Sequence, residues 1–118
     1  MQGISFIWNR WTMSATDRIR AELDSHPVVL FMKGTPQYPM CGFSDRAAQA
    51  LDACKLPYRT VNVLADPEIR AQLPRYSNWP TFPQLFIEGE LIGGCDITVE
   101  LHEQGELARM VADAGKVS

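Results

Sequence analysis

A short apolar run, a loop and a helical pattern follow one another in the first half of the chain, and a cysteine stands where the loop meets the helix. Residues Val28–Met32 are all apolar and include β-branched and aromatic side chains, which predicts a buried strand. Beyond the loop, the apolar side chains of Phe43, Ala47, Ala50, Leu51 and Cys54 recur at helical spacing, which predicts a helix over about 42–54 with these residues on its apolar face. Cys41 therefore lies at the amino end of a helix, where unpaired N–H groups and the helix dipole stabilise a thiolate.

The residues around Cys41 limit the reactions in which its thiol can take part. Lys33 begins the same loop and can add a positive charge, and together these effects lower a cysteine pKa by roughly one to several units from ~8.5. Such a thiolate is a nucleophile, a metal ligand, or both. Ser44 occupies the position where a Cys-x-x-Cys protein has its second thiol. Because a hydroxyl cannot resolve a mixed disulfide, we exclude reduction of protein disulfides by a local dithiol route.

The order of the remaining elements predicts an α/β domain. A strand at 28–32, the helix after Cys41 and a strand at 58–63 favour a right-handed parallel crossover. Residues 84–93 indicate a hairpin with its turn near Gly89. Further helices are expected over 16–25, after the Asp66-Pro67 signal, and on both sides of Gly105. The predicted fold is a four-stranded mixed sheet flanked by helices on both faces.

Three of these helices begin with capping signals. Ser14 and Asp17 are spaced as a capping box, with aspartate in place of glutamate. Asp66 precedes a proline and a glutamate, a combination typical of a helix start. Asp96 is a good cap, which predicts a helix that starts near Ile97.

The length of 118 residues suits one domain with one core. We place the folded domain at 14–115, between an N-terminal extension at 1–13 without an independent fold and a C-terminal tail at 116–118. Residues 1–12 fit no element well. They are interpreted as a start-site extension ahead of Met13 or, alternatively, as an interaction arm.

Charge and cysteine usage exclude several classes of function. The formal net charge is −3 with no long run of one sign, so a nucleic-acid surface is not expected. No apolar run reaches the ~18 residues that a membrane span needs. The three cysteines have no disulfide-framework spacing, which favours a reducing compartment, and we expect a cytoplasmic protein. A zinc site is not expected either, since the cysteines are scattered and both histidines stand alone.

Three motifs in a fixed order carry a family resemblance. They are Lys33-Gly34-Thr35-Pro36 followed by Cys41-Gly42-Phe43-Ser44, then Trp79-Pro80-Thr81-Phe82-Pro83-Gln84, then Gly93-Gly94-Cys95-Asp96. With these motifs, the chain from about residue 16 to 114 resembles the monothiol glutaredoxins of the CGFS type. The resemblance implies a thioredoxin-like fold, which agrees with the element order, and a cis peptide bond before Pro83.

The resemblance also implies a glutathione site. It places Lys33 and Arg70 at the glycine carboxylate of glutathione. The backbone of Phe82 can pair with the extended tripeptide like an added strand. The N–H groups of Cys95 and Asp96 open a helix and suit the other carboxylate, while the Asp96 side chain can accept from the ammonium group.

Cys41 is expected to be both the catalytic thiol and a metal ligand. A [2Fe–2S] cluster is usually held by four thiolates, and two chains offer two. The resemblance implies that two glutathione molecules supply the others. The result is a homodimer that transfers its cluster to iron–sulfur apo-proteins, in iron–sulfur cluster assembly and iron homeostasis. The resemblance further suggests a BolA-like partner that replaces one subunit.

Several alternatives stay open at this point. A glutathione-dependent oxidoreductase that removes glutathione from protein thiols would use the same Cys41 and the same groove, so whether the chain is an enzyme is undecided. A redox-inert thioredoxin-like binding module is a third interpretation. Cys95 is either a resolving partner for Cys41 or a small residue whose backbone matters more than its sulfur. Cys54 falls on the apolar helix face and is expected to be inert.

Overall fold

The structure, a computed structural model, describes residues 13–117, so residues 1–12 of the predicted extension at 1–13 lie outside the described residues. Its elements are α1 (Ala15–Ser25), β1 (Val28–Met32), α2 (Gly42–Ala53), β2 (Arg59–Asn62), α3 (Pro67–Ser77), β3 (Gln84–Ile87), β4 (Glu90–Gly93), α4 (Cys95–Glu103) and α5 (Glu106–Val117). The predicted element order is confirmed. The last helix continues to Val117, past the predicted domain end at 115.

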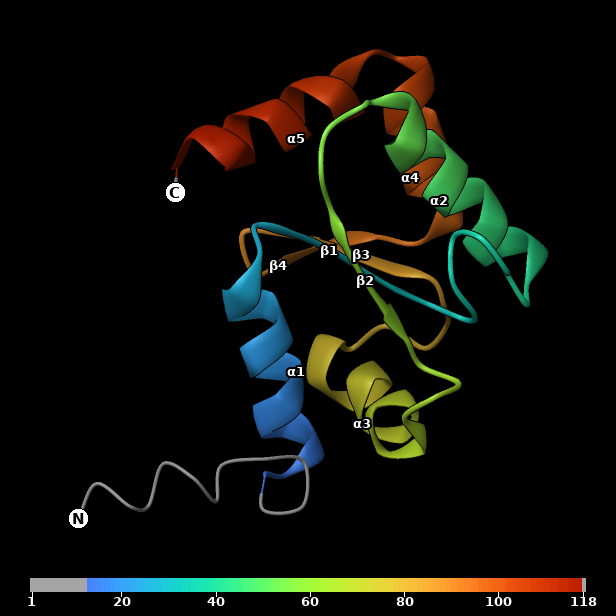
Figure 1. Ribbon diagram of the computed structural model, residues 1–118, viewed down its shortest axis with the longest axis vertical. Helices are drawn as coiled ribbons and strands as arrows, with labels where there is room; N and C mark the ends of the chain where they lie inside the picture. The colour runs from blue at the N-terminus through green and yellow to red at the C-terminus, as the bar shows by residue number, and fades with distance from the viewer. Residues whose placement is uncertain (1–12, 118) are drawn as a thin grey trace.

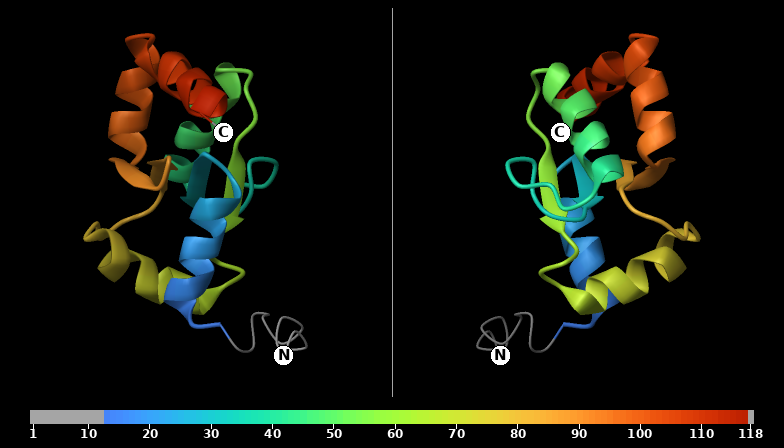
Figure 2. Two further views of the ribbon diagram at one scale, coloured as in Figure 1. Left: turned by 90° about the vertical axis from the view of Figure 1, so that its left-hand side faces the viewer. Right: turned by 90° about the vertical axis from the view of Figure 1, so that its right-hand side faces the viewer.

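The strands form one mixed sheet in the order β2-β1-β3-β4. The β1 and β2 strands are parallel, while β1 pairs with β3 and β3 with β4 in antiparallel fashion. Helices α1 and α3 lie below the sheet in Figure 1, and α2, α4 and α5 lie above it. Figure 2 shows the same layers from the two sides. The predicted four-stranded mixed sheet with helices on both faces is confirmed.

The central strand explains why its sequence is continuously apolar. All five residues of β1 are buried, and successive side chains point to opposite faces of the sheet. Leu30 and Met32 belong to the core beneath α2, α4 and α5, whereas Val29 and Phe31 belong to the core beneath α1 and α3. The domain therefore has two apolar cores, one on each face of the sheet.

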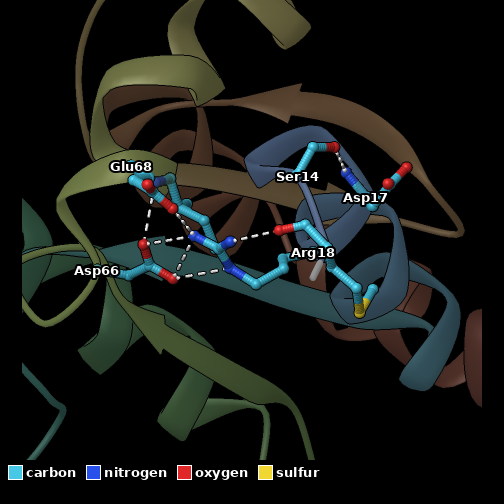
Figure 3. Close-up of polar contacts among 7 residues, drawn as sticks. Ser14, Asp17, Arg18, Asp66 and Glu68 are labelled. Atoms are coloured by element: carbon cyan, nitrogen blue, oxygen red, sulfur yellow. Dashed lines mark hydrogen bonds and ion pairs between the residues drawn. The ribbon is translucent and has the colours of Figure 1, made fainter. Parts of the chain in front are cut away.

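A polar cluster joins the first turns of α1 and α3 (Figure 3). The Arg18 guanidinium donates to Asp66 Oδ1 at 2.9 Å and to Glu68 Oε1 at 2.8 Å. Asp66 also caps α3, since its Oδ1 accepts from the Ile69 N–H at 3.2 Å, as predicted. In α1, Ser14 Oγ accepts from the N–H three residues on at 3.1 Å, which confirms the serine half of the predicted capping box.

The predicted start of the fourth helix is wrong. The cap of α4 is Gly94 and the helix begins at Cys95, so Asp96 lies inside its first turn. The Gly94 carbonyl already accepts from the Thr98 N–H at 3.1 Å and from the Thr98 hydroxyl at 2.7 Å. This carbonyl closes the first turn, so the helix starts earlier than side-chain propensity indicates. The predicted break at Gly105, which has φ +78°, is confirmed.

Candidate functional site

Cys41 lies at the start of α2 with an extended backbone and a half-buried thiol. The backbone N–H of Ser44 lowers the pKa of this thiol most strongly. The N–H of Phe43, the Ser44 hydroxyl and the charge of Lys33 lower the pKa further, while partial burial opposes them. The direction is the one expected for a thiol at the amino end of a helix.

The Ser44 side chain connects the loop before Cys41 to the helix after it by a hydrogen bond. Its side chain is completely buried, and its Oγ accepts a hydrogen bond from the Lys33 N–H at 3.1 Å. The hydroxyl oxygen therefore links the loop to the helix, while the hydroxyl group also stabilises the Cys41 thiolate. Ser44 therefore has a structural role in this loop.

Gly34 shapes the loop that leads to Cys41. Its N–H donates to Asn62 Oδ1 at 2.9 Å, and its φ is +94°. A Cβ at this position would lie 2.5 Å from the carbonyl oxygen of Tyr38. Tyr38 and Thr35 exchange two backbone hydrogen bonds of 3.1 and 3.2 Å. The chain can turn back this tightly only because residue 34 has no side chain.

The loop that leads to Cys41 forms the first wall of the site, and the loop between α3 and β3 forms the second. The Phe82–Pro83 peptide bond is cis, as the resemblance implied. Gln84 is completely buried, and its Nε2 donates to the carbonyls of Trp79 at 2.9 Å and Thr81 at 3.1 Å. One buried amide thus holds the shape of this loop.

The third wall is the turn from β4 into α4, which approaches the second wall closely. A Cβ on Gly94 would lie 3.2 Å from the carbonyl oxygen of Pro83 and 3.4 Å from Trp79 Nε1. A side chain at residue 94 would therefore need these neighbours to shift by a few tenths of an ångström.

These three walls enclose a groove of about 920 Å³. Its lining residues are Lys33, Cys41, Phe43, Arg70, Pro74, Trp79, Pro80, Thr81, Phe82, Gly94, Cys95, Asp96 and Ile97. All the predicted site residues lie along it: Cys41, Lys33, Arg70, Phe82, Cys95 and Asp96. The structure therefore gathers them into one place, and their individual roles stay predictions.

The other two cysteines differ from Cys41. Cys95 is buried, and burial raises its pKa, an effect that Asp96 and Cys41 reinforce and the charge of Arg46 opposes. Cys54 is half-buried against the core beneath α2, and burial raises its pKa too. This setting agrees with the expectation that Cys54 is inert. All three cysteines are free thiols.

Sequence reasoning missed three contributors to the site. Pro74 and Ile97 line the groove from α3 and α4, and neither belongs to one of the three sequence motifs. Arg46 acts on Cys95 across the packed helices α2 and α4. Phe43, which the helical spacing assigned to the apolar face, is 58% exposed instead. No sequence signal marks Pro74, Ile97 or Arg46 as site residues, because their place at the site depends on how the helices pack.

Two features are absent from the described part of the chain. Within residues 13–117, no group of three or more His, Cys, Asp or Glu side chains is placed to hold a metal ion. Within the same residues, no helix combines the length and apolar character needed to cross a membrane.

The chain is similar in sequence to known proteins. The sequence profile of the Glutaredoxin family matches residues 28–92. A protein named Glutaredoxin 4 from Pasteurella multocida (strain Pm70) is 52% identical over 101 residues, which cover 86% of this chain and 93% of that protein.

Two solved structures resemble most of the described domain. The solution structure of reduced poplar apo GrxS14 is 48% identical, with a TM-score of 0.72 over 84% of this chain and 91% of that one. The crystal structure of a buckwheat glutaredoxin–glutathione complex is 30% identical, with a TM-score of 0.75 over 86% of this chain and 90% of that one. The expected thioredoxin-like fold is thereby confirmed.

Proposed function

The chain belongs to the glutaredoxin family, and we propose that it is a monothiol member of the CGFS type that carries a glutathione-ligated [2Fe–2S] cluster between proteins. One observation carries the proposal. Cys41 lines the groove as a thiol of lowered pKa, while the position of a second, resolving thiol is filled by the buried hydroxyl of Ser44. A dithiol mechanism that uses a Cys-x-x-Cys pair is therefore excluded.

The charges along the groove suit glutathione, which has two carboxylates, one ammonium group and a thiol. Lys33 and Arg70 supply cations for the glycine carboxylate. The first turn of α4 supplies the N–H groups of Cys95 and Asp96 for the other carboxylate, and the Asp96 side chain can accept from the ammonium. The backbone of Phe82 offers pairing to the extended tripeptide. The buckwheat relative, which is a complex with glutathione, supports this assignment.

The donor set of the chain fits a shared cluster. Such a cluster needs four thiolates, and this chain presents Cys41 at the groove while Cys95 is buried with a raised pKa. Two copies that each contribute Cys41 and one bound glutathione complete the set. A Cβ added at Gly42, the residue after Cys41, would meet nothing within 4 Å apart from its chain neighbours, so the space at residue 42 is open.

A cluster held partly by a diffusible tripeptide suits cargo that is passed on. We propose iron–sulfur apo-proteins as recipients, in iron–sulfur cluster assembly and iron homeostasis, within a reducing cytoplasm. A BolA-like protein could take the place of one copy in a mixed pair.

The second candidate function is removal of glutathione from protein thiols, and the lowered pKa of Cys41 favours it too. The Cys41 thiolate would attack the glutathione sulfur of a protein–glutathione disulfide and release the protein thiolate. The thiolate of a second glutathione would then attack the mixed disulfide, which releases glutathione disulfide and regenerates Cys41.

Anaerobic reconstitution with glutathione, iron and sulfide separates the two candidates. We expect visible absorbance, two irons per pair of chains, and a shift from monomer to dimer in sedimentation. The Cys41→Ser variant should lose all three properties, whereas Cys54→Ser, a matched substitution outside the groove, should keep them.

A colourless monomer that rapidly turns over glutathionylated peptide would reject the carrier and support the oxidoreductase. Far-ultraviolet circular dichroism on each variant checks that it has folded.

A further inference from the structure

Three large apolar side chains lie exposed around Cys41. Tyr38, Met40 and Phe43 are 79%, 69% and 58% exposed, and we call them the apolar rim. Tyr38 and Met40 belong to the loop before Cys41, and Phe43 belongs to the first turn of α2. Isolated exposed apolar residues are ordinary, but three of this size around a reactive thiol indicate an interaction surface.

Backbone hydrogen bonds hold the apolar rim in place. The Met40 N–H donates to the Lys33 carbonyl at 3.0 Å. The Tyr38 N–H donates to the carbonyl of Thr35 at 3.1 Å and to its Oγ1 at 3.0 Å. The loop is therefore tied at both rim positions, and it presents these side chains to solvent.

The proposed function identifies the occupant of this surface as a second copy of the chain. Two Cys41 sulfurs that share one cluster must bring the two chains together at the faces around Cys41. Met40 directly precedes Cys41 and Phe43 follows it by two positions, so both lie at the junction. Burial of the apolar rim between the copies would then stabilise the pair.

Met40 is the rim residue whose side chain can be modified by an oxidant. The susceptibility of methionine to oxidation follows exposure. Among the described methionines, Met32 is completely buried, Met13 and Met110 are half-buried, and Met40 is exposed. Oxidation converts an apolar thioether into a polar sulfoxide.

We propose that Met40 is a peroxide-oxidisable site whose sulfoxide weakens the pairing of two copies of the chain; the effect on pairing rests on the proposed function. In this reaction the O–O bond of hydrogen peroxide breaks and one oxygen atom is transferred to the Met40 sulfur. The sulfur is oxidised by two electrons, and the other oxygen leaves as water. Methionine sulfoxide reductases reverse the change.

Peptide mapping by mass spectrometry tests the modification site without reference to the cluster. The Cys41→Ser protein is treated with hydrogen peroxide so that the reactive thiol does not compete. We expect Met40 to be oxidised about tenfold faster than Met32, with Met110 in between. Equal rates at Met40 and Met32, in protein shown to be folded by circular dichroism, would overturn the proposal.

Sedimentation of cluster-loaded protein tests the effect on pairing. Met40→Gln imitates the polar sulfoxide and Met40→Leu keeps an apolar side chain of similar size. We expect Met40→Gln to pair about tenfold more weakly than Met40→Leu. Equal pairing of the two variants would refute the inference while the proposed function stands. If the unsubstituted protein forms no cluster-bound pairs, both the proposed function and the effect on pairing fail, and peptide mapping alone decides the modification site.

Discussion

Asp66 is the residue through which α1 and α3 depend on each other, and Asp66→Ala should destabilise the domain more than its single hydrogen-bonding group suggests. The carboxylate caps α3 at Ile69 N–H and also accepts the Arg18 guanidinium through both oxygens (Figure 3). The side chains of Arg18 and Asp66 are each 12% exposed. The substitution therefore removes a cap and leaves a mostly buried guanidinium with fewer partners.

The expected cost follows from these two contributions. Loss of an N-cap carboxylate costs about 1 kcal/mol, and loss of a hydrogen-bonded partner from a buried charge costs about 1–3 kcal/mol. Arg18 keeps Glu68 at 2.8 Å and the Met13 carbonyl at 2.9 Å, so the lower part of the second range applies. We expect Asp66→Ala to lower the free energy of unfolding by about 2–3 kcal/mol, a large share of the 5–15 kcal/mol typical of a domain.

Two further variants separate the contributions. Asp66→Asn keeps a good capping side chain and removes the charge. It should therefore lower the free energy of unfolding by about half as much as Asp66→Ala does. Glu68→Ala removes the other carboxylate on Arg18, but that side chain is 74% exposed, and exposed ion pairs contribute only about 0–1 kcal/mol.

Urea unfolding followed by circular dichroism measures all three variants at a common denaturant slope. If Asp66→Ala and Glu68→Ala lose the same stability, burial is not what makes the Arg18–Asp66 contact matter, and the reasoning fails.

Three other changes have defined outcomes. The pKa of Cys41 is lowered in the folded protein, so its thiolate contributes stability that is present above the unfolded pKa of ~8.5 and is lost as pH falls through the folded value. The stability difference between the unsubstituted protein and Cys41→Ser should therefore grow as pH rises toward ~8.5, as urea unfolding across pH would show; a constant difference contradicts the lowered pKa. Gly34→Ala should cost about 1–3 kcal/mol, because φ is +94° and the new Cβ would lie 2.5 Å from a carbonyl oxygen. Its matched control, Gly42→Ala, meets nothing within 4 Å, so thermal unfolding should rank it clearly above Gly34→Ala. Tyr58→Phe should cost about 1 kcal/mol, because the half-buried hydroxyl donates to Asp52 at 2.7 Å; unchanged urea unfolding would show that this bond contributes nothing.

Local sequence patterns were enough to predict most of the fold. The uninterrupted apolar run at Val28–Met32 marks a strand that is covered on both faces, and the structure covers it with a separate core on each side. The caps at Ser14 and Asp66 are local hydrogen bonds between neighbours in sequence, which is why they could be predicted.

The predictions that failed depend on contacts between distant segments. Asp96 has the propensity of a cap, but the turn from β4 fixes Gly94 as the first acceptor of α4. The spacing of Phe43 matches that of the buried residues of α2. Phe43 nevertheless lies in the first turn of α2, beside the groove, and its side chain is exposed. In both cases the position of an element relative to its neighbours overrode local preference.

The sequence alone was enough to place Cys41 at a helix end, where its pKa is lowered, with no local resolving thiol, since both features follow from adjacent residues and backbone electrostatics. It also determined the element order and the mixed sheet, because hydrophobic periodicity and turn chemistry act over short distances. Only the tertiary structure decided that Lys33, Arg70 and Asp96 line one groove with this thiol. They come from separate elements, and only the packing of helices on the two faces of the sheet brings them together.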